Sequence, residues 1–214
     1  MAVSITQATE VGTVYDLEQI DAISAIARSH GLPLHLDGAR FANALVALKT
    51  TPAEMTWKRG VDLVSFGGTK NGCWCAEAVI LFDLDRADEF DFIRKRAAQL
   101  FSKSRFIAAQ FEAYFDGDLW LQTATHANAM AARLADRIRA SKSVRLAWEP
   151  QANEVFAIME AQTMERLQAK GARFYEWPSP HGFDDVGAGE KLGRFVTSFA
   201  TTEEDVDRFG ELIA

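Results

Sequence analysis

The sequence is poor in the features that mark membrane, secreted and disulfide-stapled proteins. Its 214 residues include 2 cysteines and 5 prolines, and no apolar run reaches the roughly 20 residues that a membrane-spanning helix needs. Cys73 and Cys75 are too few to cross-link a small secreted fold or to enclose a zinc ion with thiolates alone. The N-terminus also lacks the basic-then-apolar order of a signal peptide. We therefore expect a cytoplasmic protein with free thiols, no membrane partner and no metal ion.

Positive charge is scarce as well. The chain has 23 basic and 30 acidic residues and a formal net charge of -7 at pH 7, which disfavours nucleic acid or an anionic membrane surface as the main partner. One basic cluster, at residues 94–96, is typical of a solvated helix face. The hydrophobic content of 48% and the charged content of 25% are those of a globular protein with a sizeable core.

Short apolar runs alternate with helical patterns in the first half of the chain. Asp16 and Gln19 have the spacing of a capping box, at the start of a helix that Gly31 ends. The other patterns predict strands over 3–6, 34–37, 63–66 and 78–82, and helices over 41–48 and 56–59. Strands that alternate with helices indicate a mainly parallel sheet with a ligand crevice at the carboxyl ends of its strands.

The second half of the chain has a different pattern. Helical spacing runs over 85–141 with breaks near Ser102 and at Asp116-Gly117, and its last part, 119–138, is typical of a long spacer helix. Further strands are expected over 144–148, 155–159, 173–177 and 195–199, and further helices over 163–169 and 203–213. The predicted fold class is α/β, with a mostly parallel large domain over 1–117 and a small α+β domain over 118–214 that begins with the spacer helix.

Two segments just past predicted strand ends carry reactive groups. Asp37 comes three residues before Arg40, and Thr69 directly precedes Lys70. A lysine amine can form a Schiff base with pyridoxal phosphate (PLP), and an aspartate can keep the pyridine nitrogen of PLP protonated, so that the ring accepts electrons from a substrate carbon. An arginine at position 40 could hold a carboxylate or a ring oxygen through two hydrogen bonds. Both segments also have interpretations without a functional role, because a lysine after a strand is usually solvated and an Asp-Gly pair usually makes a turn.

The residues around both segments resemble the motifs of low-specificity threonine aldolases. Residues 34–43, LHLDGARFAN, are similar to the aspartate motif of that family, and residues 64–72, VSFGGTKNG, are similar to its lysine motif, in the same order and at the same separation. Residues 9–12, TEVG, resemble the lead-in to the helix that follows them. Residues 193–198, GRFVTS, are similar to the small-domain strand whose arginine holds the substrate carboxylate.

This resemblance implies an enzyme of the PLP-dependent, aspartate aminotransferase-like fold. Within it, Lys70 is the residue that bonds to PLP, and Asp37, Arg40 and Thr69 bind the cofactor. Arg194 is expected to hold the substrate carboxylate together with Arg40. The implied reaction cleaves a β-hydroxy-α-amino acid, such as threonine or allo-threonine, to glycine and an aldehyde. The resemblance also implies a homodimer or a homotetramer.

Two alternatives stay open. Other β-eliminating lyases, transaminases and racemases share the fold and the pairing of an aspartate with a lysine, so the fold alone does not separate them. In addition, the family has a cofactor-phosphate loop and a ring-stacking histidine ahead of the point where this chain starts. The chain is therefore expected to be N-terminally truncated, and a non-catalytic remnant that folds or oligomerises without PLP is the second alternative.

Other polar residues near the motifs have milder interpretations. His35 is expected to be packed or hydrogen-bonded beside the site rather than directly catalytic. Cys73 and Cys75 are expected to be small apolar loop residues rather than redox or metal groups. By resemblance, three basic residues are candidates that approach the cofactor or the site of a neighbouring subunit: Arg96, Lys103 and Arg105.

Overall fold

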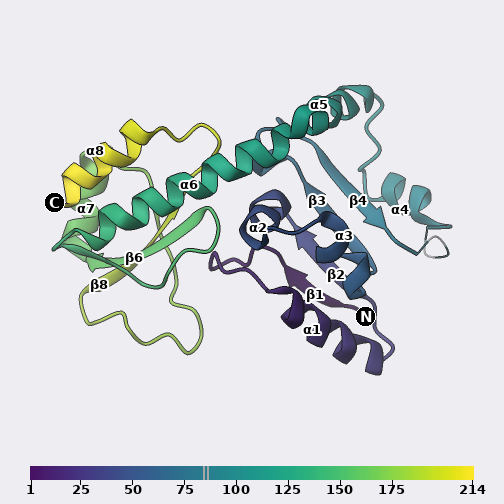
Figure 1. The fold of residues 1–214 in the computed structure, drawn as a ribbon, viewed down its shortest axis with the longest axis horizontal. Coiled ribbons are helices and arrows are strands. Elements are labelled where there is room, and N and C mark those ends of the chain that lie inside the picture. Colours follow the sequence, from purple (N-terminus) through teal and green to yellow (C-terminus); the bar gives the residue numbers. More distant parts are fainter. Residues whose placement is uncertain (84, 86) are drawn as a thin grey trace. The chain divides into compact units, whose positions relative to one another are not determined.

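The computed structural model describes residues 1–83, 85 and 87–214 (Figure 1). Contacts between Cα atoms divide them into two compact units. The first unit consists of Met1–Thr9 and Val14–Thr123, and the second of Glu10–Thr13 and Ala124–Ala214. The predicted domains, 1–117 and 118–214, stay a prediction, because compactness within one chain does not test whether each part folds alone.

A four-stranded sheet forms the centre of the first unit. Its strands follow one another in chain order: β1 (Val3–Thr6), β2 (Leu34–Gly38), β3 (Leu63–Gly67) and β4 (Glu77–Leu81). The first three strands are parallel and β4 runs antiparallel to β3. The α/β class and the mainly parallel sheet are thus confirmed, with β4 as the antiparallel edge strand. All four strands lie at the predicted places to within two residues.

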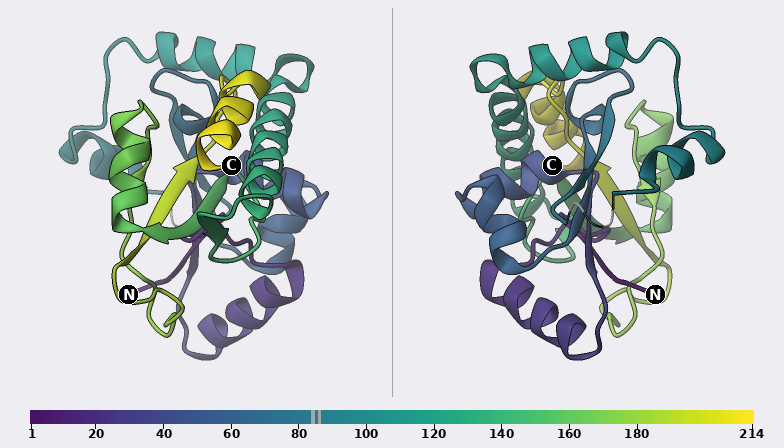
Figure 2. Two further views of the ribbon diagram at one scale, coloured as in Figure 1. Left: turned by 90° about the vertical axis from the view of Figure 1, so that its left-hand side faces the viewer. Right: turned by 90° about the vertical axis from the view of Figure 1, so that its right-hand side faces the viewer.

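Helices of the first unit cover one face of this sheet. They are α1 (Leu17–Ser29), α2 (Phe41–Leu48), α3 (Pro52–Met55) and the 3-10 turn η1 (Trp57–Arg59). Figures 1 and 2 show α1, α2 and α3 on the same side of the strands. Leu34, Leu36 and Val64 are buried, whereas the alternate residues His35 and Asp37 are half-buried. Because side chains of a strand alternate between its two faces, the helix-covered face is the apolar one and the opposite face carries polar side chains.

The start of α1 confirms the predicted capping box. The Asp16 carboxylate accepts a hydrogen bond from the backbone N–H of Gln19 at 2.7 Å, and the Gln19 side chain accepts one from the backbone N–H of Asp16 at 2.9 Å. Two N–H groups that have no partner inside the helix are satisfied in this way.

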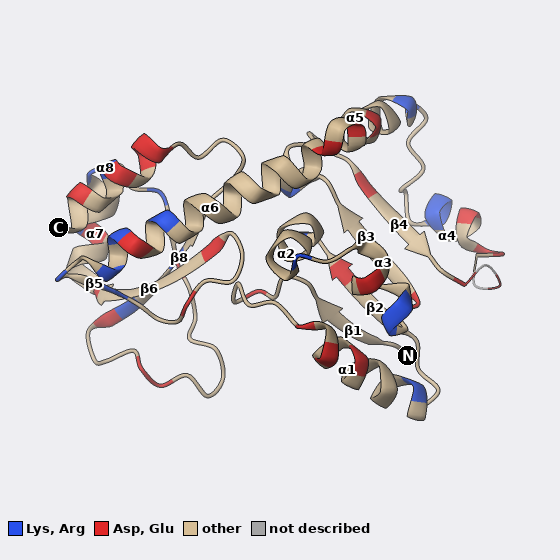
Figure 3. Cartoon of the chain, in the orientation of Figure 1, with Lys and Arg blue, Asp and Glu red and all other residues tan. Residues whose placement is uncertain are grey.

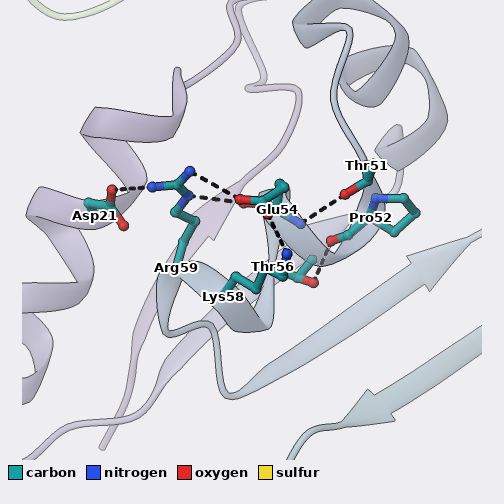
Figure 4. A network of polar contacts seen from close by, with 7 residues as sticks. All are labelled: Asp21, Thr51, Pro52, Glu54, Thr56, Lys58 and Arg59. Atoms are coloured by element: carbon teal, nitrogen blue, oxygen red, sulfur yellow. Dashed lines mark hydrogen bonds and ion pairs between the residues drawn. The ribbon is translucent and has the colours of Figure 1, made fainter.

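A polar network joins α3 and η1 to α1 (Figure 4). Arg59 pairs with Asp21 at 2.7 Å and with Glu54 at 3.1 Å, and Lys58 pairs with Glu54 at 2.5 Å. The hydrogen bond from Lys58 lowers the pKa of the Glu54 carboxyl. Because these side chains are 28–46% exposed, each ion pair contributes little to the free energy of unfolding.

Aromatic side chains pack around Phe66 near the end of β3. The Phe66 ring centroid lies 5.3 Å from that of Phe41, 6.0 Å from Phe111, 5.8 Å from Phe115 and 6.2 Å from Trp120. These rings come from β3, from α2, from α5 (Arg105–Phe115) and from the start of α6 (Leu119–Arg139). Full burial of a Phe side chain contributes about 1.5–3 kcal/mol. This applies to Phe41 and Phe66, which are 3% and 5% exposed and hold α2 against β3, whereas Phe115 is 46% exposed.

The helical pattern predicted over 85–141 corresponds to α4 (Phe90–Arg96), α5 and α6. Its predicted breaks are confirmed, because residues 97–104 separate α4 from α5 and Gly117 has a φ of 54°. Arg86 lies in this pattern but outside the described residues. The basic cluster at residues 94–96 is exposed on α4, as expected for a solvated helix face (Figure 3).

The second unit contains an antiparallel sheet. Its strands lie in the order β5 (Val144–Leu146), β6 (Glu154–Glu160), β8 (Glu190–Val196) and β7 (Tyr175–Glu176). One face of the sheet packs on α6, on α7 (Ala161–Ala169) and on α8 (Glu203–Ile213), through a core that includes Val155, Leu167 and Phe195 (Figure 2). The other face holds a smaller cluster around Phe156 and Leu192.

Ion pairs join α6 to α8 on the surface of the second unit. Asp207 accepts hydrogen bonds from Arg133 at 2.8 Å and from Arg137 at 2.7 Å. These hydrogen bonds lower the pKa of the Asp207 carboxyl. The two arginines lie on α6 and the aspartate on α8, and both helices carry coloured charged positions in Figure 3.

Three predicted strands of this unit have wrong bounds. The strand predicted over 144–148 ends at Leu146, the one over 173–177 shrinks to Tyr175–Glu176, and the one over 195–199 is the end of a strand that starts at Glu190 and stops at Val196. After Val196 the hydroxyls compete with sheet pairing, because Thr201 accepts a hydrogen bond from the backbone of Ser198 at 2.9 Å and closes a turn.

None of the helices within residues 1–83, 85 and 87–214 combines the length and the apolar character needed to cross a bilayer.

Candidate active site

Asp37 lies near the carboxyl end of β2, between the two other parallel strands. The register pairs it with Thr6 of β1 and with Ser65 of β3. Its Oδ1 accepts a hydrogen bond from the backbone N–H of Ala39 at 3.1 Å, which fixes the turn that leads into α2. Among the described residues no other hydrogen bond to this carboxylate is present, so its second oxygen can accept one from a ligand. The strand end thus presents a half-buried carboxylate of fixed orientation.

His35 lies on the same face of β2, two residues before Asp37. Its Nδ1 lies 2.8 Å from the Ser4 hydroxyl oxygen on β1, and its Nε2 lies 2.9 Å from the Ser65 hydroxyl oxygen on β3. The imidazole therefore bridges all three parallel strands. The prediction that His35 is hydrogen-bonded is confirmed.

Lys70 lies on a 3-10 turn, η2 (Thr69–Asn71), that follows β3. Thr69 and Lys70 are exposed, and no described residue forms a hydrogen bond or an ion pair with the Lys70 amine. A Cβ atom added to Gly67 would lie 3.0 Å from the Cα of Ala39, so the end of β3 and the segment directly after β2 approach closely. The fold thus brings the turn of Asp37 and the turn of Lys70 to the same end of adjacent strands.

Asn71 anchors the lysine turn, and this role had no signal in the sequence beyond its place next to Lys70. It is buried, and its Nδ2 donates to the Tyr114 hydroxyl oxygen at 2.6 Å and to the Trp120 carbonyl at 2.8 Å. Burial raises the pKa of Tyr114 to about 12, against the smaller opposing effect of the Asn71 hydrogen bond. The phenol is therefore a neutral structural partner of Asn71 at physiological pH.

The two cysteines are free thiols in the loop after Lys70. Burial raises the pKa of Cys73, which disfavours the reactive thiolate form. Gln110 on α5 accepts hydrogen bonds from the backbone N–H groups of Trp74 at 2.8 Å and Cys75 at 3.1 Å, and so fixes this loop. Within the part of the chain that the structure describes, no group of three His, Cys, Asp or Glu residues is placed to hold a metal ion.

Other basic candidates differ in their exposure. Arg40 precedes α2 and is 7% exposed, so its charge lies inside the first unit. Arg96, Lys103 and Arg105 are all exposed, on α4, on the connection after it and at the start of α5. The structure therefore separates one buried arginine beside the Asp37 turn from three solvated ones.

Arg194 lies on β8 in the second unit. Its Nε donates to Glu154 Oε1 on β6 at 2.8 Å, and its Nη2 donates to the same oxygen. Its Cζ lies 4.4 Å from the ring centroid of Trp177. The sequence pointed to Arg194 through its resemblance, but neither Glu154 nor Trp177 carried a signal.

The chain matches the family model of β-eliminating lyases over residues 1–162. It is 44% identical over 210 residues to the low specificity L-threonine aldolase of Pseudomonas aeruginosa, a match that covers 98% of this chain and 57% of the relative. The protein of the same name from Pseudomonas sp. (strain NCIMB 10558) is 43% identical over 204 residues, with coverages of 95% and 56%.

Solved structures of other proteins also match this chain. A structure of Leishmania major threonine aldolase matches with a TM-score of 0.88 and 31% identity, over 99% of this chain and 60% of that chain. A structure of Oryza sativa TDC with PLP and tryptamine matches with a TM-score of 0.70 and 18% identity, over 100% of this chain and 47% of that one. The second likeness concerns the fold alone.

The mainly parallel sheet has the Asp37 carboxylate near the end of β2 and, in the turn after β3, the Lys70 amine, which has no partner among the described residues. Together with these matches it defines a fold of the PLP-dependent threonine aldolase type. The chain belongs to the β-eliminating lyase family. The resemblance seen in the motifs is thereby confirmed. The chain spans about half the length of the curated relatives it matches, 57% and 56%.

Proposed function

We propose that this chain carries the lysine-bearing part of a PLP-dependent threonine aldolase. The proposed enzyme cleaves threonine or allo-threonine to glycine and an aldehyde. The observation that carries the proposal is the Lys70 amine, which is exposed and has no partner among the described residues, in the turn next to that of Asp37. The 44% identity to a low specificity L-threonine aldolase supports this reaction over those of other enzymes with the same fold.

The residues of the first unit fit PLP by their chemistry. Lys70 supplies the amine that bonds to the cofactor aldehyde, and Asp37 offers a carboxylate oxygen that holds a proton on the ring nitrogen. Thr69, exposed beside Lys70, and Arg40, buried beside the Asp37 turn, complete the proposed cofactor contacts. When bound, PLP supplies an electron sink for the charge that develops at the substrate α-carbon.

We propose that Arg194 binds the substrate carboxylate, with Arg40 as a second contact. A guanidinium forms two parallel hydrogen bonds to a carboxylate, which fixes the orientation of the amino acid and hence of the bonds at its α-carbon. In the net reaction the β-hydroxyl loses its proton, the bond between the α- and β-carbons breaks, and the α-carbon takes up a proton. By the same resemblance, we propose a cytoplasmic homodimer or homotetramer that acts on a small amino-acid substrate.

The decisive experiment is an absorbance spectrum of the purified protein with and without added PLP, followed by borohydride reduction and peptide mapping. The proposal expects the reduced cofactor on the peptide that contains Lys70. Glycine and acetaldehyde released from L-threonine and L-allo-threonine would identify an aldolase. A keto acid released together with ammonia would identify a β-elimination, and a keto acid formed without ammonia would identify a transaminase. A labelled peptide without Lys70 would show that another lysine bonds to PLP and would contradict the proposal. No fixed cofactor on a folded protein would also contradict it and would favour a remnant that binds no PLP.

A further inference from the structure

Arg194 and Glu154 lie on the same face of the second sheet. Strands β6 and β8 are antiparallel neighbours, and the register places Arg194 opposite Phe156. Because residues two apart on a strand point to the same face, Glu154 is the diagonal neighbour of Arg194. The pair is therefore built into the register of the sheet, and a change in strand pairing would break it.

The contact uses one particular edge of the guanidinium. Nε and Nη2 of Arg194 both donate to Oε1 of Glu154, the first at 2.8 Å. The guanidinium has two edges that can each donate a pair of hydrogen bonds. The N–H groups of Nε and Nη2 used here form the edge that we call the side edge, and one N–H of Nη1 with the other N–H of Nη2 forms the end edge. Among the described residues no hydrogen bond to Nη1 is present. The end edge has the spacing for a bidentate contact with a second carboxylate.

Glu154 is deeply buried, which distinguishes this pair from surface ion pairs. The exposed fraction of its side chain is 0%, against 14% for Arg194. A turn at Gly12 covers it, since a Cβ added there would lie 3.0 Å from Glu154 Cβ. The carbonyl of Val11 in this turn accepts a hydrogen bond from Trp148 Nε1 at 2.9 Å. A buried carboxylate is costly unless it is paired, so Glu154 holds a cation tightly.

Trp177 restricts the guanidinium from a third direction. Its ring centroid lies 4.4 Å from Cζ of Arg194, within the range of a cation–π contact. With one edge bonded to Glu154 and one face against the indole, the guanidinium has little rotational freedom. A group held in this way loses little entropy when it binds a ligand.

We infer that Glu154 is a positioning residue, which fixes the side edge of Arg194 so that its end edge is preset to receive a carboxylate. This inference rests on the proposed role of Arg194 in substrate binding. Stability alone does not explain the pair, because a buried ion pair is seldom more stabilising than well-packed apolar side chains of similar volume. Glu154 acts only through Arg194 and does not touch the substrate.

The experiment compares ligands with and without a carboxylate. Glycine and glycinamide carry the same amine, and only glycine offers a carboxylate to Arg194. Dissociation constants of both are measured by absorbance on the PLP-loaded protein, for the wild type, R194Q, E154Q and the double variant. E154Q is expected to weaken glycine binding by up to about 100-fold, the cost of a misplaced binding group, and to leave glycinamide binding unchanged. In the R194Q background, E154Q should have no further effect.

A second readout needs no cofactor. The emission of Trp177, obtained as the difference between each variant with and without W177F, reports the position of the guanidinium over the indole. E154Q is expected to change this emission as R194Q does. The matched control is E190Q, which removes the carboxylate that pairs with Arg145 on the same sheet, at an arginine that is 49% exposed. It should keep both the glycine preference and the Trp177 emission of the wild type.

The possible results distinguish a wrong role for Arg194 from a wrong role for Glu154. If R194Q keeps the wild-type preference for glycine over glycinamide, the proposed role of Arg194 is wrong, and the positioning role falls with it. If R194Q loses that preference while E154Q keeps it, only the positioning role is wrong. Should E154Q fail to fold, E154M replaces it, because an unbranched apolar side chain of similar length fills the same space. Wild-type Trp177 emission in E154M or E154Q, beside an altered emission in R194Q, would also overturn the inference.

Discussion

Asn71 donates a hydrogen bond to the Tyr114 hydroxyl at 2.6 Å, and this contact links the turn that carries Lys70 to helix α5. The same amide donates to the Trp120 carbonyl at the start of α6. One buried side chain therefore satisfies partners on two helices, directly next to the proposed catalytic lysine. The position of Lys70 depends on this anchor as well as on β3.

Replacement of Asn71 by alanine is expected to destabilise the protein. N71A removes both donors and leaves the buried Tyr114 hydroxyl and Trp120 carbonyl without them, at a cost of about 1–3 kcal/mol. Urea denaturation measures the change in the free energy of unfolding. The control is Q122A, which removes an exposed amide that donates to the Gly117 carbonyl at 2.8 Å and should cost less than about 0.5 kcal/mol. Equal effects of the two substitutions would show that Asn71 is no anchor.

Lys70 should be dispensable for folding and essential for cofactor attachment. The K70A variant removes an exposed side chain that has no partner among the described residues, so its unfolding free energy should stay within about 0.5 kcal/mol of the wild type. Borohydride treatment in the presence of PLP should then leave no cofactor on the protein. K142A, at another exposed lysine, should retain the wild-type label. Full labelling of K70A would disprove the assigned role.

The Gly12 turn should tolerate no side chain. Gly12 has a φ of +73°, and an added Cβ would lie 3.0 Å from both Cβ and the carbonyl oxygen of Glu154. Gly31 has a φ of +63° with nothing within 4 Å of the added atom. G31A should therefore cost only the backbone strain, about 1–2 kcal/mol, and G12A should cost about 1–3 kcal/mol more through overpacking. Chemical denaturation of both variants tests this difference, and a G12A variant no less stable than G31A would refute it.

Local patterns predicted most of the first unit. The capping box of Asp16 and Gln19 fixes the start of α1 within four residues of chain, and helix α2 has the predicted bounds, Phe41–Leu48. Asp37 and Lys70 were found because strand ends and motif resemblance are also local features. The structure places Lys70 in the turn after β3, as expected, whereas Asp37 lies inside β2, where it pairs with Ser65, and not just past the end of its strand.

Contacts between distant residues escaped prediction from the sequence. Asn71 and Tyr114 are 43 positions apart, and Glu154 and Arg194 are 40 apart. Such pairs depend on strand register and helix packing, which single-segment periodicity does not encode. The end of β8 was predicted wrongly for a local reason. The apolar residues up to Phe199 suggested that the strand continues, but β8 ends at Val196, and the hydrogen bond between Ser198 and Thr201 closes a turn after it.

Acid should weaken the second sheet through Glu190. The hydrogen bond from Arg145, followed by one from the backbone of Gly187, lowers the pKa of the Glu190 carboxyl to about 2. A carboxyl whose pKa is depressed by folding adds stability above its unfolded pKa, near 4.3, and loses that contribution as the pH falls through its folded pKa. The wild type should therefore melt at a higher temperature than E190Q near pH 6, and the gap should close between about pH 4 and pH 2. Thermal melts across this range, with E165Q as an exposed carboxylate of the same unit, test the prediction. A gap that persists unchanged at pH 2 would show that the Glu190 charge is not its source.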